Sequence, residues 1–98
     1  MTTKQRAYLK GLAMNIDPIF QIGKSGLTTE YLESVEEALE ARELIKINVL
    51  KNCLDEPKEL AYAIGENTLS EVVQVIGRKI VLYREARQPE KRKIVLPK

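Results

Sequence analysis

The chain has 98 residues, of which 44% are hydrophobic and 31% charged, and these values fit one soluble domain with a modest core. No segment approaches the roughly 20 apolar residues of a membrane span, and the N-terminus does not resemble a signal peptide, so we expect a cytoplasmic protein without a membrane partner. With one cysteine and no histidine, an intramolecular disulfide is excluded, the usual zinc sites are absent, and a nucleophile would lack its most common base. We therefore expect no enzyme activity, metal, cofactor or small-molecule substrate.

The net charge of +2 hides an uneven distribution along the chain. Residues 1–26 carry +3 and residues 77–98 carry +6. Residues 27–43 and 55–76 instead carry −5 and −4. A folded form could therefore present one positive face beside negative ones, as in proteins that bind nucleic acids.

A first helix is predicted to begin at Thr2 or Thr3, either of which can cap it, and to end near Met14. Arg6 and Lys10 lie four residues apart on this helix and repel each other weakly, so they favour either an anionic partner or simple solvation. The proline of "NIDP" ends the helix, and "IFQI" then predicts a short strand.

The stretch "QIGKSGLTTE" follows this strand and leads into a second helix. It is not a P-loop, because Pro18 stands where that motif needs its first glycine. Free amides at a helix start attract anions, and Gly23 and Gly26 would let a phosphodiester approach the backbone beside Lys24. RNA-binding KH modules use a GxxG loop in this way, although glycine pairs at this spacing also occur in ordinary turns.

The second helix is predicted from about Thr28, with an apolar stripe on one side. Its opposite side carries Glu30, Glu33, Glu37 and Glu40, which we expect to be solvated and to repel phosphates. "ELIKINVLKN" alternates apolar and polar residues and predicts a half-buried strand.

A third helix is predicted after this strand, with Asp55 as its cap, Pro57 in its first turn and Gly65 at its end. "EVVQVIGRKIVLYR" then predicts two strands joined by a tight turn near Gly77. Residues 85–98 are basic and polar apart from "IVL", and predict a mobile tail, with a short edge strand as the alternative.

These elements predict an α/β (α+β) fold in the order helix-strand-helix-strand-helix-strand-strand. A strand-helix-strand unit needs a right-handed crossover, so the first two strands should be parallel neighbours. The final hairpin should add antiparallel strands, which gives a small four-stranded mixed sheet packed with three helices.

Four blocks of the sequence, taken in order, resemble the CRM domain of chloroplast RNA splicing and ribosome maturation proteins. They are "KQRAYLKGLA", "QIGKSGLT", "EALEARELIKINVL" and "VVQVIGRKIVLYR", and they cover about Thr3 to Arg84. The length resembles the bacterial stand-alone member of YhbY type. The resemblance implies a single domain over residues 1–84 that is similar to the C-terminal domain of translation initiation factor three. It also implies binding to ribosomal RNA within precursors of the large ribosomal subunit.

The resemblance further implies which residues contact RNA. The glycine loop corresponds to the family's RNA-contacting loop, and basic residues match in the first helix and in or after the hairpin. The latter could instead confer only solubility. The candidate RNA-binding residues are Gly23, Lys24, Ser25, Gly26, Lys4, Arg6, Lys10, Arg78, Lys79 and Arg84.

Two hypotheses follow. In the first, the chain is a monomeric RNA-binding factor that assists ribosome assembly and recognises RNA shape and backbone more than base sequence. In the second, it is a protein-interaction module of the ribosome or translation machinery that works through the acidic second helix or through Ile94 to Leu96.

Overall fold

The computed structural model describes residues 1–98 and shows the predicted order of elements. The four strands form one mixed sheet in the order β1-β2-β4-β3, with β1 parallel to β2 and the other pairs antiparallel. Both the element order and the parallel first pair are therefore confirmed. The elements are α1 (Thr3–Ala13), β1 (Phe20–Ile22), α2 (Thr29–Arg42), β2 (Leu44–Val49), α3 (Pro57–Thr68), β3 (Glu71–Ile76), β4 (Lys79–Tyr83) and a 3-10 turn (Pro89–Lys91).

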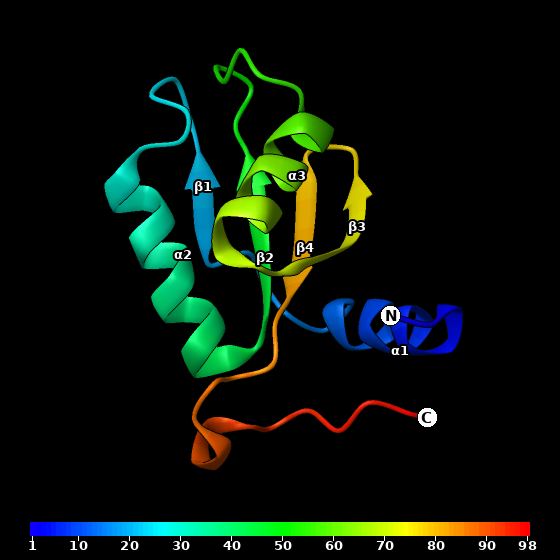
Figure 1. The fold of residues 1–98 in the computed structure, drawn as a ribbon. Helices are drawn as coiled ribbons and strands as arrows, with labels where there is room; N and C mark the ends of the chain where they lie inside the picture. The colour runs from blue at the N-terminus through cyan, green and yellow to red at the C-terminus, as the bar shows by residue number, and fades with distance from the viewer.

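Apolar residues on the two faces of the sheet build two separate cores. On one face, Ile45 and Ile47 of β2 belong to a cluster with buried residues of α2 and α3. On the other face, Leu44 belongs to a smaller cluster with Leu9 of α1. This alternation follows from the period of two along a strand. Figure 1 shows α2 and α3 over the sheet, with α1 and the C-terminal segment at its lower end.

Short local contacts set the starts of the first two helices. The Thr2 hydroxyl accepts a hydrogen bond from the Gln5 amide at 3.0 Å, and the Gln5 side chain accepts one from the Thr2 amide at 3.1 Å. This reciprocal capping box satisfies two amides that would otherwise lack partners. Thr28 caps α2 by accepting from the amide of Tyr31 at 3.0 Å.

Both predicted ends of the third helix are wrong. Glu56, and not Asp55, is the N-cap residue, and its side chain makes no capping bond, while Pro57 takes the first helical position as predicted. The helix also runs past Gly65 to Thr68, where Leu69 adopts a left-handed conformation with φ of 54°. Gly65 is needed for packing instead, because a β-carbon there would stand 3.1 Å from the carbonyl oxygen of Ser70.

The C-terminal segment, residues 85–98, is predicted as a mobile tail; in the structure it contacts the domain and forms no edge strand. It runs across the lower end of the sheet toward α1 (Figure 1), where the Gln5 side chain donates to the carbonyl of Pro97 at 3.0 Å. Ile94 and Leu96 pack against the smaller core cluster. The segment therefore covers apolar surface that α1 alone leaves open.

Glu43, directly after α2, holds this segment in place. Its carboxylate is completely buried and accepts hydrogen bonds from the amides of Ala86, Lys93 and Ile94 at 2.7 to 2.9 Å. Burial of the carboxyl raises its pKa, but the three amides outweigh that effect, and the pKa of Glu43 is lowered overall. The sequence gives no sign of this role, because Glu43 looks like one more glutamate of an acidic helix.

Glu40 corrects the prediction of a fully solvated glutamate stripe. Its two carboxylate oxygens accept from the amides of Arg87 and Gln88 at 2.8 and 3.0 Å, and these bonds lower its pKa. Glu33 and Glu37 remain exposed, as the stripe predicts. One end of the acidic face of α2 is thus occupied by the chain itself.

We predict that Glu43→Gln lowers the free energy of unfolding at pH 7 by about 2 kcal/mol, because a charged acceptor of three buried amides becomes neutral. The lowered folded-state pKa means that the ionised carboxylate stabilises the fold above its unfolded pKa of about 4.3, and that this stability is lost as pH falls through the folded value. Urea denaturation at several pH values should therefore show a smaller loss of stability on acidification in the variant. Glu37→Gln, at an exposed position, is the matched control and should behave as the parent chain. Equal stability of all three proteins at pH 7 would contradict the role of Glu43.

Candidate nucleic-acid interface

Three connections meet at one end of the sheet, which we call the loop end: residues 23–28, 50–56 and 77–78. The parallel pairing of β1 and β2 brings the ends of both strands together, and the amide of Leu50 donates to the carbonyl of Ile22 at 2.8 Å. The β3–β4 turn joins them through the amide of Val49, which donates to the carbonyl of Arg78 at 2.7 Å. Figure 1 shows the three connections together at the top of the sheet.

The glycine loop forms a tight turn at this end. The amide of Gly26 donates to the carbonyl of Gly23 at 3.1 Å, which leaves Lys24 and Ser25 exposed at the tip. Gly26 has φ of +65°, a left-handed conformation that glycine adopts without strain. The turn leads into α2, whose first amides lack helical acceptors and whose dipole favours an anion.

The second connection packs against the glycine loop. A β-carbon at Gly23 would lie 3.4 Å from both the Asn52 side chain and Leu50, and one at Gly26 would lie 3.6 Å from Asp55. The two glycines therefore allow the two loops to lie close together. They also leave the backbone of the turn without side chains that would hinder a ligand. Asp55 places one negative charge behind the loop, which limits how strongly that side attracts phosphate.

Arg78 and Lys79, both predicted site residues, lie at the loop end but use their charges differently. The Arg78 guanidinium donates to the carbonyls of Val49 and Leu50 at 2.8 and 2.6 Å, so it fixes the base of the second connection. Lys79 is exposed and donates to the Asn48 side chain at 3.1 Å. Lys79 thus keeps most of its ammonium group accessible to a ligand.

Lys51 was not predicted as a site residue, although it is exposed at the same end. Lys24, Lys51 and Lys79 have no carboxylate partner, whereas Arg6, Arg84, Arg87 and Arg92 do. The signal for Lys51 was present in the sequence, because loops that follow adjacent parallel strands must emerge at the same edge. The loop end therefore carries three free ammonium groups around a glycine turn.

The three predicted cations of α1 lie elsewhere. This helix packs at the lower end of the sheet, away from the glycine loop (Figure 1). Arg6 donates to the carbonyls of Val72 and Val73, where β3 has a bulge, and pairs with Glu71 at 3.8 Å. Lys4 and Lys10 are exposed without ion-pair partners.

Arg84 occupies a structural position at the end of the sheet opposite the loop end. Its side chain is only 8% exposed, and its guanidinium donates to Glu36 at 2.7 Å and to the carbonyl of Thr68 at 2.9 Å. Glu40 lies 3.6 Å from the same group. This burial argues against the predicted contact of Arg84 with RNA, because its charge is already used within the chain.

The CRS1/YhbY (CRM) domain family matches residues 1–84 of the chain. The chain belongs to this family. The probable RNA-binding protein YqeI of Bacillus subtilis is 43% identical over 97 residues, with 99% of each chain covered. An RNA-binding protein of Haemophilus influenzae is 39% identical over 98 residues, which cover 100% of this chain and 96% of the relative.

A solved structure shares the fold. The solution structure of the hypothetical protein SAV1595 from Staphylococcus aureus superposes with a TM-score of 0.78 at 50% identity, and 99% of each chain is covered. The fold and the CRM family membership expected from the sequence are both confirmed. The two curated relatives are themselves named as RNA-binding proteins, the first as a probable one.

We predict that Arg84→Gln and Lys79→Gln have opposite effects. The first breaks a buried ion pair and should lower the free energy of unfolding by about 2 kcal/mol, while affinity of the folded protein for a structured RNA transcript stays unchanged. The second removes an exposed charge and should change stability by no more than about 0.5 kcal/mol, but it should weaken RNA binding. Urea denaturation and filter binding below the unfolding transition measure the two quantities. A loss of RNA affinity in folded Arg84→Gln would indicate that Arg84 contacts RNA.

Proposed function

We propose that the chain binds the sugar-phosphate backbone of RNA and that the loop end is the contact surface. The observation that carries this proposal is the meeting of the GKSG turn, the start of α2 and three lysines without acidic partners at one end of the sheet. Amides and ammonium groups in this arrangement suit phosphate oxygens. The RNA-binding names of its relatives support the same conclusion.

The loop end offers little for reading bases. Its exposed side chains include no aromatic group on which a base could stack, and phosphate contacts position RNA without carrying sequence information. These side chains are Lys24, Ser25, Thr28, Lys51, Asn52, Leu54, Asp55 and Glu56. Because Lys24, Lys51 and Lys79 would each displace counterions, affinity should fall as salt concentration rises. Recognition at this surface therefore depends on the shape and backbone of the RNA.

We further propose that the RNA is ribosomal RNA within precursors of the large subunit, and that the chain assists assembly there as a cytoplasmic monomer. The support for this finer role is membership of a family that the CRM resemblance links to ribosome maturation. The alternative is a protein-interaction module, but part of the surface that it would use is already in contact with the rest of the chain. Ile94 and Leu96 pack against the smaller core, and Glu40 is bound to the C-terminal segment.

We predict that Gly26→Asp weakens binding to a structured transcript of large-subunit ribosomal RNA by about tenfold or more, a cost of about 1.4 kcal/mol. The variant adds a negative charge where phosphate would approach. Gly26→Asn is the matched control, because it has the same size without the charge and asparagine tolerates a left-handed φ. Asn should weaken binding much less than Asp, while both variants remain folded by circular dichroism. Binding of the Asp variant with parental affinity would exclude the glycine loop from the interface.

The ribosomal role has its own test, which is UV crosslinking in bacterial cells that express the chain, followed by sequencing of the attached RNA and mapping of the crosslinked peptides. We expect reads concentrated on precursors of large-subunit ribosomal RNA, with crosslinks in residues 23–26. Reads spread over all transcripts would contradict the ribosomal role. Crosslinks confined to residues 85–98 would contradict the loop-end site.

A further inference from the structure

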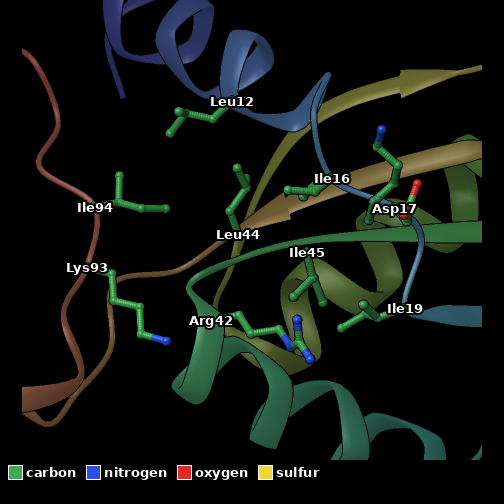
Figure 2. A pocket seen from close by; sticks show the side chains of 10 residues that line it. Leu12, Ile16, Asp17, Ile19, Arg42, Leu44, Ile45, Lys93 and Ile94 are labelled. Carbon is green, nitrogen blue, oxygen red and sulfur yellow. The ribbon is translucent and has the colours of Figure 1, made fainter.

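A cavity of about 530 Å³ lies away from the loop end, between the end of α1, the start of β2 and the C-terminal segment. Its volume falls within the roughly 300 to 1,000 Å³ range of small-ligand sites. Figure 2 shows the side chains of Leu12, Ile16, Leu44 and Ile94 directed toward a common space, with Ile19 at one side. The cavity is therefore apolar at its centre.

Charged groups surround this apolar centre. Arg42, Lys46 and Lys93 line the cavity, and none of them has a carboxylate within ion-pair distance. Asp17 is the one acidic side chain of the lining. Three free cations against one carboxylate favour an occupant that has both an apolar body and a negative charge.

Lys46 connects this cavity with the loop end. Its side chain lies on the same face of β2 as Asn48, which accepts the hydrogen bond from Lys79. Lys46 and Lys79 also line a second, smaller hollow beside Met14 on this face. Cations thus continue from the glycine loop across the open part of the sheet to the apolar cavity.

We propose that this cavity receives the base of one unpaired nucleotide of the RNA that the loop end holds, an inference that rests on the proposed function. Aliphatic side chains enclose the faces of the base, and Arg42 adds a positive charge to the lining of the cavity. Lys46 and Lys93 bind the phosphates on either side, and Asp17 accepts a hydrogen bond from an amino or imino group of the base.

The C-terminal segment completes the site. The amides of Lys93 and Ile94 both donate to the same Glu43 oxygen, at 2.7 and 2.9 Å, so one wall of the cavity is fixed by the buried carboxylate. This wall is absent if the segment is released. The role of the segment in RNA binding is therefore to shape a pocket, in addition to any attraction by its charge.

The direct test is methyl NMR of the full chain with labelled isoleucine and leucine, titrated with short single-stranded oligonucleotides of each base. An abasic oligonucleotide with the same phosphates is the control for charge alone. We expect at least one base-bearing oligonucleotide to shift the methyl signals of Ile16, Ile19 and Leu44, and the abasic one to leave them unchanged. Methyl signals that no oligonucleotide shifts, or that the abasic control shifts equally, would overturn the proposal and favour a protein partner for this surface.

Two variants confirm the location. Ile19 is 37% exposed and lines the cavity, whereas Val95 is 84% exposed and does not. Ile19→Asp should abolish the shifts of Ile16 and Leu44, and Val95→Asp should preserve them. If Ile19→Asp does not fold, Arg42→Gln serves in its place and should weaken the same shifts, because one positive charge of the cavity lining is lost.

The loop-end variant Gly26→Asp separates this proposal from the proposed function. Gly26→Asp should reduce binding of the large-subunit transcript and leave the oligonucleotide shifts at the cavity in place. If the cavity shifts are absent while Gly26→Asp still weakens transcript binding, the cavity proposal fails and the proposed function stands. If Gly26→Asp binds the transcript normally but the cavity shifts are present, the loop-end site fails, and the cavity is an independent nucleotide site.

Discussion

The buried Glu43 carboxylate joins the end of α2 to three backbone amides of the C-terminal segment. Glu43 lies where α2 ends and β2 begins, with a positive φ of 65°, and its backbone carbonyl accepts a hydrogen bond from the amide of Arg84 at the end of β4. Its side chain binds three amides of the C-terminal segment, which are 43 to 51 residues away in sequence. An unpaired buried carboxylate would be very costly, so the segment and the domain stabilise each other. The cover of the smaller core and one wall of the apolar cavity both follow from this contact.

The parallel pairing of β1 and β2 has a comparable effect at the other end of the sheet. A parallel pair requires a crossover, and α2 provides it, so the glycine turn before α2 emerges beside the loop that follows β2. The antiparallel hairpin then delivers Lys79 to the same edge. Lysines without acidic partners therefore gather around the start of a helix, while buried ion pairs gather at the opposite end.

Charge counted along the sequence gives a misleading picture of where an anion can bind. Residues 77–98 carry +6, but Arg84, Arg87 and Arg92 pair with glutamates of the chain. Arg6 pairs with Glu71 in the same way. What matters for a ligand is which cations remain without partners in the folded chain. These include Lys24, Lys51 and Lys79 at the loop end, Arg42, Lys46 and Lys93 beside the cavity, and Lys4 and Lys10 of α1.

The sequence by itself determined the element order and the glycine turn, because these depend on residues within a few positions of one another. The parallel first pair and the mixed sheet then followed from the element order, because a strand-helix-strand unit needs a right-handed crossover. Threonine caps, a period of two in the strands and a proline at a helix start are local signals, and only the ends of α3 were misjudged. Tertiary structure alone decided that Glu43 holds the C-terminal segment, that Arg84 is buried and that Arg6 binds the bulge of β3. The amides that the Glu43 side chain binds lie 43 to 51 residues away, and the Glu36 partner of Arg84 lies 48 residues away. The two carbonyls that Arg6 binds lie 66 and 67 residues away. A charged residue looks the same in sequence whether it meets water, a buried amide or a phosphate, since only packing in three dimensions decides which group it faces.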